Sequence, residues 1–196
     1  SELLPDSPTA EKQIGGGGMS MAELCEAAIT LSDNTAANLI LANVGGPPAL
    51  TAFVRGVGDV VTRLDRIEPE LNEGTPGDPR DTTSPVAMLD TLCTLLLGDT
   101  LSRQSRDQLT VWLVANTTGK NRLRAGLPID WRIGDKTGSS SAGITNDVAI
   151  GWPPRGGPLL ITAYFAESAN NDSARNDVIA EVGRIAATFR GSSRTR

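Results

Sequence analysis

Residues 131–165 read WRIGDKTGSSSAGITNDVAIGWPPRGGPLLITAYF, and this stretch decides the fold. Its apolar segments are separated by turns rich in Gly and Pro, which is typical of consecutive short strands. We predict strands over Trp131–Asp135, Asp147–Trp152 and Leu159–Phe165. Three strands that follow one another directly in the chain indicate an antiparallel sheet.

A long helix is expected to cover one face of this sheet. Over Asp172–Phe189, four apolar residues recur at helical spacing and therefore share one side of the helix: Val178, Val182, Ile185 and Phe189. A helix with one apolar side packs that side against a sheet. This part of the chain therefore predicts a sheet with its closing helix packed on it.

The preceding part of the chain is predicted to be mostly helical. Ser20 and Glu23 have the spacing of a capping box at a helix start. Gly45 follows a run rich in Ala and Leu, as a C-cap does. Helices are expected over Met21–Leu31, Thr35–Val44, Pro47–Val57, Val86–Leu97 and Arg103–Asn116.

One long loop interrupts these helices. Arg63–Thr83 contains three prolines and two glycines, which exclude a helix or a central strand. A long loop without secondary structure inside a compact domain is usually functional. The predicted fold class is therefore α+β, with a helical region over 1–118 that carries this loop and the sheet with its closing helix over 119–196.

Composition excludes several kinds of chemistry. The 196 residues include no histidine, so neither a Ser-His-Asp nor a Cys-His mechanism can be assembled within the chain. Cys25 and Cys93 lie too far apart to suit a zinc site. The formal net charge of -5 argues against a nucleic-acid partner, and the longest apolar stretch, Leu159–Ala166, is too short to span a bilayer. We expect no cofactor, no metal, no nucleic-acid partner and no membrane partner.

Three polar motifs occur in a fixed order along the chain. They are Ser32-Asp33-Asn34, Glu68-Pro69-Glu70-Leu71-Asn72 and Lys136-Thr137-Gly138. Taken singly, each has an ordinary interpretation: a helix cap, a solvated acidic loop and a polar strand end. Their order, spacing and local contexts together argue against three independent ordinary interpretations.

In this combination the chain resembles the class A serine β-lactamases, and the resemblance covers essentially its whole length. Further matching segments are Gly45-Gly46-Pro47, Arg66 before Glu68, Arg80-Asp81-Thr82-Thr83 and Arg122-Leu123-Arg124-Ala125-Gly126-Leu127-Pro128. The resemblance implies the fold shared by serine β-lactamases and penicillin-binding proteins. It also implies a small-molecule β-lactam substrate, a monomeric full-length protein, and a periplasmic or secreted location.

The resemblance gives the loop a hydrolytic role. A β-lactamase acylates a serine and then hydrolyses the ester. Glu68 resembles the general base that activates the deacylating water, and Asn72 the second residue that holds this water. Pro69 is expected to follow a cis peptide bond that directs the carboxylate. Arg66 and Asp81 are expected to pair across the base of the loop.

The resemblance also assigns the other two motifs. Ser32 would relay a proton to the leaving lactam nitrogen, and Lys136 would support Ser32 and add positive charge. Asn34 would bind the amide of the substrate side chain. The remaining substrate-binding residues would hold the substrate carboxylate and contribute a backbone N–H of Ser139 to the oxyanion hole; they are Arg122, Thr137, Gly138 and Ser139.

One part of the family pattern is missing. The chain has no Ser-x-x-Lys; Thr9-x-x-Lys12 and Thr117-x-x-Lys120 mimic it, but neither fits the position of the nucleophile. In the family, this motif and the first strands of the sheet precede the residues matched here. We therefore expect that the N-terminal strands are absent, and that the chain alone is inactive and poorly folded. Cys25 matches a half-cystine of some relatives, whereas Cys93 is expected in the core.

Two other functions remain open. A transpeptidase-like penicillin-binding protein shares the first and third motifs but does not need Glu68 to Asn72. A non-catalytic fragment that complements a separate N-terminal segment is the second alternative. The start Ser1–Asp6 lacks the basic flank and apolar core of a signal peptide.

Overall fold

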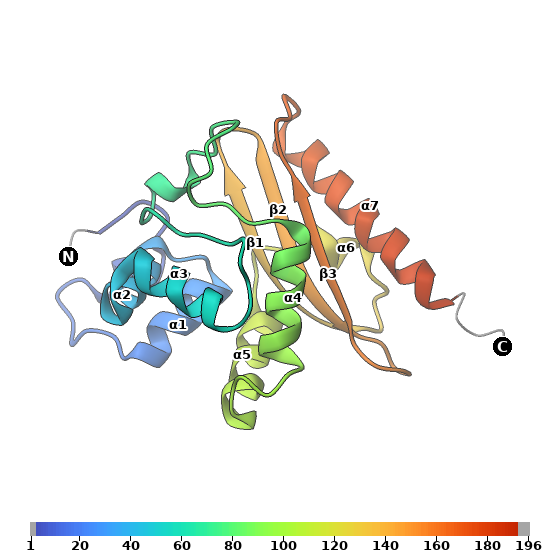
Figure 1. The fold of residues 1–196 in the computed structure, drawn as a ribbon, viewed down its shortest axis with the longest axis horizontal. Coiled ribbons are helices and arrows are strands. Elements are labelled where there is room, and N and C mark those ends of the chain that lie inside the picture. Colours follow the sequence, from blue (N-terminus) through green and yellow to red (C-terminus); the bar gives the residue numbers. More distant parts are fainter. Residues whose placement is uncertain (1–2, 192–196) are drawn as a thin grey trace. The chain divides into compact units, whose positions relative to one another are not determined.

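The computed structural model describes residues 3–191. The chain divides into two compact units between Ser102 and Arg103. We call them the helical unit and the sheet unit (Figure 1). The predicted division at residue 118, into a helical region and a region of strands with a closing helix, stays a prediction. Helix α5 (Arg103–Ala115) belongs to the sheet unit because it packs against the first strand.

The helical unit is built around α1 (Met21–Thr30) and α2 (Asn34–Val44), which pack against each other. The predicted capping box is present at the start of α1: Ser20 N donates to Glu23 Oε2 at 2.7 Å, and Glu23 N donates to Ser20 Oγ at 3.3 Å. A small buried core joins the two helices, formed by Leu24, Ala27 and Ala36.

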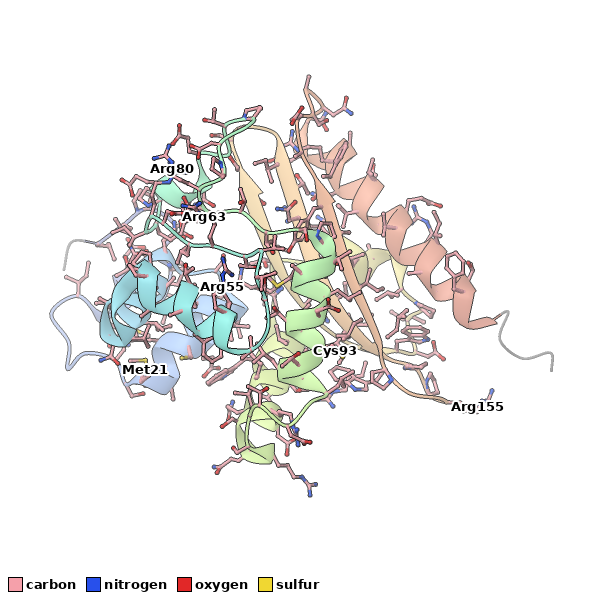
Figure 2. The ribbon with its side chains drawn as sticks, viewed as in Figure 1. Met21, Arg55, Arg63, Arg80, Cys93 and Arg155 are labelled. Atoms are coloured by element: carbon pink, nitrogen blue, oxygen red, sulfur yellow. The ribbon has the colours of Figure 1, made fainter. Side chains whose placement is uncertain are left out.

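The rest of this unit consists of two short 3-10 helices and two further α-helices. They are the 3-10 helices η1 (Glu11–Gln13) and η2 (Glu70–Asn72), and the helices α3 (Gly46–Gly56) and α4 (Pro85–Leu96). The expectation that Cys93 lies in the core is wrong, because α4 buries Thr91 and Leu96 and leaves Cys93 exposed (Figure 2).

The sheet unit contains the antiparallel strands β1 (Arg132–Ser140), β2 (Ile144–Trp152) and β3 (Leu159–Phe165), in that order. The short α6 (Leu123–Gly126) and the long α7 (Asp172–Gly191) complete it with α5. The predicted α+β class and the antiparallel sheet are confirmed. The predicted end of the first strand at Asp135 is wrong, because β1 pairs with β2 as far as Ser140 opposite Ile144. Lys136-Thr137-Gly138 therefore lies within a strand.

Helices cover both faces of the sheet. Leu123 of α6, Ile133, Ala149 and Ile161 of the three strands, and Ile179 of α7 belong to one buried cluster. On the opposite face, a Cβ added to Gly134 would lie 3.0 Å from the Cβ of Leu113 in α5. The sheet is therefore held between α6 and α7 on one side and α5 on the other.

The predicted apolar side of the closing helix is partly wrong. Val178, Ile185 and Phe189 are exposed, whereas Val182 packs against the core as predicted. The side that faces the sheet also carries Ile179, with Ala186 and Ala187. Close approach of α6 favours small residues here: a Cβ on Gly126 would lie 1.8 Å from the carbonyl oxygen of Ala180.

No single helix among the described residues is long and apolar enough to cross a membrane. Helices α2 and α3 together meet the length and composition criteria, but they are bent by 75°.

Candidate active site

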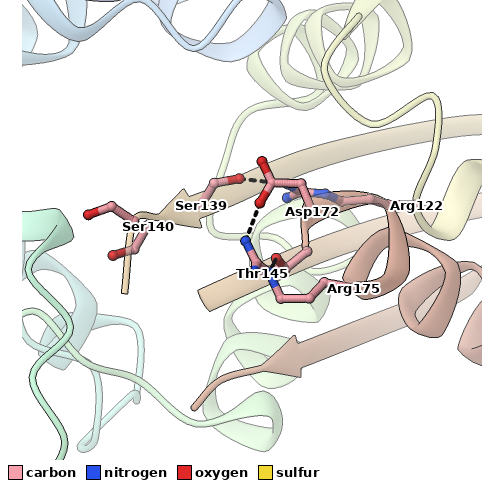
Figure 3. A pocket seen from close by; sticks show the side chains of 7 residues that line it. Arg122, Ser139, Ser140, Thr145, Asp172 and Arg175 are labelled. Atoms are coloured by element: carbon pink, nitrogen blue, oxygen red, sulfur yellow. Dashed lines mark hydrogen bonds and ion pairs between the residues drawn. The ribbon is translucent and has the colours of Figure 1, made fainter. Parts of the chain in front are cut away.

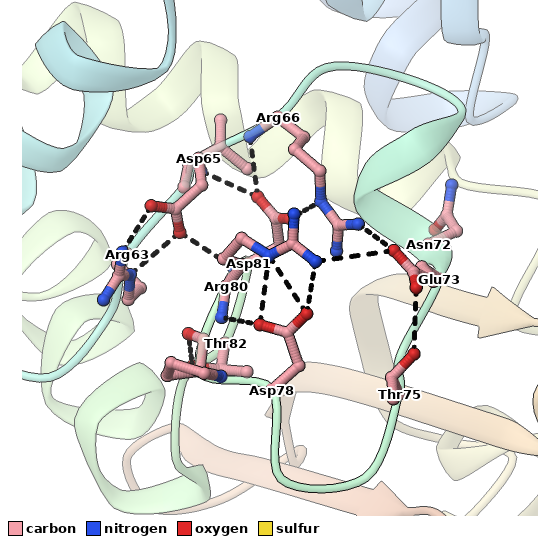
Figure 4. A network of polar contacts seen from close by, with 12 residues as sticks. Arg63, Asp65, Arg66, Asn72, Glu73, Thr75, Asp78, Arg80, Asp81 and Thr82 are labelled. Carbon is pink, nitrogen blue, oxygen red and sulfur yellow. Dashed lines mark hydrogen bonds and ion pairs between the residues drawn. The ribbon is translucent and has the colours of Figure 1, made fainter.

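Hydrogen bonds to the buried carboxylate of Asp81 join the two ends of the loop over Arg63–Thr83 (Figure 4). Asp81 accepts hydrogen bonds from the backbone N–H groups of Asp65 and Arg66 at 2.7 and 2.9 Å, and from Arg66 Nε at 2.5 Å. Its side chain is only 2% exposed. Burial alone would raise the pKa of Asp81, but these hydrogen bonds outweigh burial and hold the pKa below its usual value. Arg66 and Asp81 thus form the expected pair, and their role in holding the loop for catalysis by other residues stays a prediction.

Further ion pairs follow the outer edge of the loop. Arg66 also pairs with Glu73, and Arg80 Nη2 lies 2.5 Å from Asp78 Oδ2 (Figure 4). The Arg80 side chain holds the pKa of Asp78 down at about 2. These outer pairs are more exposed than Asp81 and stabilise less, since exposed ion pairs gain little over water.

The loop holds Glu68 by contacts on both its side chain and its backbone. The Glu68–Pro69 peptide bond is cis. Asn72 Nδ2 donates to Glu68 Oε2 at 2.5 Å, so the two residues expected to hold a water are in direct contact. Asn38 of α2 binds the backbone of Glu68 twice: its Nδ2 donates to Glu68 O, and its Oδ1 accepts from Glu68 N, both at 2.9 Å.

Asn38 was not predicted from the sequence. Its signal was modest: it lies four residues after Asn34, which puts both amides on one side of α2. Because two hydrogen bonds from one rigid side chain fix a peptide unit in place, Asn38 orients Glu68 relative to the helix.

The Ser32-Asp33-Asn34 motif forms a tight turn into α2. Ser32 has a φ of +56°, a conformation that residues other than Gly rarely adopt and that is enriched at functional sites. Asp33 is fully buried and accepts from Ala36 N at 2.9 Å, which caps α2. Asn34 Nδ2 donates to the carbonyl of Pro5 at 3.1 Å. The middle residue therefore holds the turn, and its neighbours are the candidates for chemistry.

In the sheet unit, Arg122 joins the third motif to the rest of the unit. Its Nη1 donates to Gly138 O at 2.9 Å and to Asn146 O at 2.7 Å. Its Nη2 donates to Ser139 Oγ at 2.6 Å, and its Nε to Asn176 Oδ1 at 2.8 Å. These bonds place the guanidinium beside Gly138 and Ser139, as expected. Asn176, which was not predicted, fixes the guanidinium from α7.

The rest of the third motif presents polar groups along β1. Lys136 Nζ donates to Thr137 O at 2.7 Å, and the hydroxyls of Thr118 and Thr137 lie 2.6 Å apart. Together with Arg122 and Ser139, this arrangement offers cationic and hydroxyl donors that suit a carboxylate ligand.

Two fully buried carboxylates lie behind this surface, and neither was singled out from the sequence. Asp135 pairs with Arg124 and accepts from Asn116 Nδ2 at 3.0 Å. Asp147 Oδ2 accepts from Leu123 N at 3.0 Å, while Asp147 Oδ1 has no hydrogen-bond partner among the described residues. The sequence signal was an acid inside an apolar strand, which is rarely buried unless it is paired.

These buried charges affect one another. Burial raises the pKa of Asp147 to about 8, and the neighbouring charge of Asp135 adds to this effect. Burial lowers the pKa of the Arg122 guanidinium, and the charge of Asp147 opposes that shift. Asp147 is therefore mostly protonated at neutral pH, and it carries its full negative charge near this cation only above about pH 8.

Predicted site residues lie in both units. In the helical unit, Glu68 and Asn72 contact each other on the loop, and Ser32 and Asn34 lie at the turn into α2. In the sheet unit, the predicted residues lie on or beside β1: Arg122, Lys136, Thr137, Gly138 and Ser139. Within residues 3–191, no group of three His, Cys, Asp or Glu side chains is arranged to hold a metal ion. The residues of the helical unit offer a fixed carboxylate for proton transfer, and those of the sheet unit offer an anion site.

Comparisons with known proteins identify the family of the chain. Residues 1–189 match the model of the Beta-lactamase enzyme family. Over 185 residues the chain is 49% identical to β-lactamase CTX-M-97 of Escherichia coli and 47% identical to β-lactamase OXY-1 of Klebsiella oxytoca, covering 94% of this chain and 63% of each relative. The chain thus spans less than two thirds of their length.

A solved structure supports the same relationship. An ancestral (GNCA) class A β-lactamase superposes with a TM-score of 0.94 at 64% identity, covering 95% of this chain and 72% of that one. The expected serine β-lactamase-like fold is therefore confirmed.

The first prediction concerns the base of the loop. Asp81→Ala removes the acceptor of three hydrogen bonds and leaves Arg66 without its buried partner, so the loop should open more often. We expect proteolytic cleavage within residues 63–83 to become about 100-fold faster, since each of the three lost bonds typically contributes about 1 kcal/mol. Limited proteolysis should use a completed protein, defined as residues 1–196 joined to the N-terminal part of a full-length relative such as CTX-M-97.

Asp78→Asn is the matched control, because its partner Arg80 lies on the outer edge of the same loop. Equal cleavage of both variants would contradict a special role for Asp81.

The second prediction concerns pH. A carboxyl whose pKa rises from 3.8 to about 8 on folding binds a proton in the folded state that the unfolded chain releases. Its contribution to stability is therefore complete below pH 4 and is lost as the pH rises through 8, with a slope of at most about 1.4 kcal/mol per pH unit. Asp147→Asn cannot titrate, so its unfolding free energy relative to the parent should rise steadily between pH 5 and 8. Urea unfolding of the completed protein measures this difference, and a pH-independent difference would contradict the assignment.

Proposed function

Because the chain belongs to the class A β-lactamase family, we propose that the protein hydrolyses β-lactam amides through an acyl-serine intermediate. The observation that supports this most directly is the placement of Glu68, whose carboxylate contacts Asn72 and whose backbone is held by Asn38. A fixed carboxylate suits a general base, because a base must lie within hydrogen-bond reach of the proton it takes. The family relationship also supports a periplasmic or secreted location.

The first half of the proposed reaction forms the ester. A serine from the Ser-x-x-Lys motif expected in the completed protein attacks the lactam carbonyl, and the C–N bond breaks. Ser32 relays a proton to the departing nitrogen, with Lys136 supporting it. The backbone N–H of Ser139 donates to the carbonyl oxygen as negative charge develops there.

The second half releases the product. Glu68 takes a proton from a water, which attacks the ester carbonyl, and the ester C–O bond breaks. The serine recovers its proton, and the product leaves as a free acid. Throughout, Arg122 and the polar groups of Thr137, Gly138 and Ser139 hold the substrate carboxylate, and Asn34 holds the side-chain amide.

A transpeptidase-like penicillin-binding protein remains the main alternative, because it would use the first and third motifs in the same way. It transfers the acyl group to an amine rather than to water and has no need of a base for deacylation. The Glu68 to Asn72 contact favours hydrolysis. A fragment that only complements an N-terminal segment would be inactive alone but active once that segment is supplied.

The decisive experiment for the third prediction uses Glu68→Ala in the completed protein. The parent should hydrolyse a chromogenic cephalosporin, whereas the variant should acylate and then stall, with deacylation slowed by about 100-fold or more. Mass spectrometry should show the acyl-enzyme persisting, and steady-state turnover should fall. The 196-residue chain by itself should show no turnover.

Glu70→Ala is the matched control, since Glu70 is an exposed acid two residues away in the same loop. A stalled acyl-enzyme in Glu68→Ala but not in Glu70→Ala supports hydrolysis. Unchanged deacylation in Glu68→Ala would remove Glu68 from this role and favour the transpeptidase alternative.

The fourth prediction concerns carboxylate binding. Arg122→Ala in the completed protein removes the guanidinium beside Gly138 and Ser139, so KM for a carboxylate-bearing β-lactam should rise by about tenfold to 100-fold. Arg122→Lys should recover only part of this loss, because an ammonium cannot reproduce four hydrogen bonds made in one plane. Steady-state kinetics measures both variants, and an unchanged KM would exclude Arg122 as the carboxylate partner.

A further inference from the structure

A polar pocket of about 440 Å³ opens in the sheet unit beside Arg122, and its charged groups come from different elements (Figure 3). Arg122 lies just before α6, and Asp172 and Arg175 lie in the first turns of α7. The other lining residues are hydroxyl-bearing: Ser139, Ser140, Ser141 and Thr145. Two guanidiniums and four hydroxyls around one cavity favour an anionic ligand over an apolar one.

The two arginines retain hydrogen-bonding capacity toward such a ligand. Of the five N–H groups of Arg122, four donate to acceptors on Gly138, Asn146, Ser139 and Asn176. Arg175 uses three: it donates to Thr145 Oγ1 at 2.9 Å, to the carbonyl of Asn170 and to the carboxylate of Asp172. Among the described residues, one N–H of Arg122 and two of Arg175 therefore have no acceptor.

Arg175 and Asp172 differ greatly in how firmly they are held. The side chain of Arg175 is 10% exposed, whereas that of Asp172 is 87% exposed. Figure 3 shows the Asp172 carboxylate beside the Arg175 guanidinium, at the end of the pocket away from Ser140. An exposed carboxylate can swing into water at little cost, while the buried guanidinium stays in place. Arg175 is thus the permanent part of this ion pair, and Asp172 is the replaceable part.

The negative charge of Asp172 also acts on Arg122, because it raises the pKa of that guanidinium against the lowering caused by burial. The pocket therefore carries two positive charges and one negative charge, with a net charge of +1. A ligand with one negative group balances this charge. A ligand with two negative groups has to compete with Asp172 for Arg175.

We propose that Asp172 is a specificity-determining residue: as the built-in counter-ion of Arg175, it makes the pocket favour singly charged ligands, and its neutralisation opens a two-arginine site for dianions. This inference rests on the proposed function for its link to β-lactams, which carry the carboxylate expected at Arg122. Asp172 does not touch the reacting atoms in this proposal. It acts on which β-lactams bind, through the charge that a second substituent brings into the pocket.

The fifth prediction tests this with Asp172→Asn in the completed protein. Sulfate serves as a dianion and acetate as a monoanion, and each is titrated while NMR follows the Nε–H signals of the arginines. Because one repulsive charge is removed beside the ligand, we expect sulfate binding to tighten by about tenfold and acetate binding by less than about threefold, with both effects shrinking in high salt. This readout needs no hydrolysis.

Kinetics provides the second readout. For a β-lactam with one negative group and another with two, the KM ratio should shift toward the doubly charged substrate in Asp172→Asn, and the change in KM should exceed any change in kcat. Asp177→Asn is the matched control, because it removes the same charge from an exposed position of α7 that does not line this pocket. A role of Asp172 limited to stabilising the start of α7 would change the melting temperature in Asp172→Asn but not the preference between mono- and dianions.

The outcomes separate this proposal from the proposed function. Sulfate binding that tightens selectively in Asp172→Asn, in a protein that does not hydrolyse β-lactams, would support the two-arginine site and refute the hydrolase. Normal hydrolysis, with sulfate and acetate affinities that change equally in Asp172→Asn and Asp177→Asn, would overturn the role of Asp172 and leave the hydrolase intact.

Discussion

The position of the Arg122 guanidinium is the constraint on which the sheet unit's functional surface depends. It binds β1 through Gly138 and Ser139, β2 through Asn146 and α7 through Asn176. Burial of such a cation is costly without a nearby negative charge. At neutral pH the carbonyl oxygens of Gly138 and Asn146 offset this cost by accepting its hydrogen bonds. The fully buried Asp147 is held by the backbone N–H that follows Arg122, and because its pKa is raised to about 8 it adds its full charge only at higher pH. One cation therefore sets the position of the anion site.

In the helical unit, side-chain hydrogen bonds to the backbone hold the loop over 63–83 in position. Its loop has little regular structure and makes its backbone hydrogen bonds mostly to side chains: Asp81 holds the base, and Asn38 holds the peptide unit of Glu68. A loop held at defined points by buried polar groups keeps a catalytic carboxylate in one direction while the outer residues stay tolerant of change. In both units, a buried polar residue that does not face the ligand orients the residue that does.

Sequence reasoning succeeded where the signal was local. The antiparallel strands, the capping box at Ser20 and the loop over 63–83 follow from short-range chemistry, and the structure contains all three. Sequence reasoning failed where packing between several elements determines which side chains are buried or where a strand ends. The apolar side of α7 was misassigned because the close approach of α6 selects small residues, and β1 was ended too early because pairing with β2 outweighs the polar character of Lys136-Thr137-Gly138. Cys93 was misplaced because an apolar helix buries only the side that meets a partner.

The fold class, the family relationship and most candidate site residues could be predicted from the sequence, because short motifs are recognised by residue type and spacing alone. The polar groups that support these motifs became visible only in the folded chain. No sequence motif marks Asn38, Asp147 or Asn176. Each makes a hydrogen bond to a residue far away in the sequence: to Glu68, Leu123 and Arg122, which lie 30, 24 and 54 positions away. The charge of a buried carboxylate likewise depends on desolvation and on neighbouring ions, which exist only once the chain has folded.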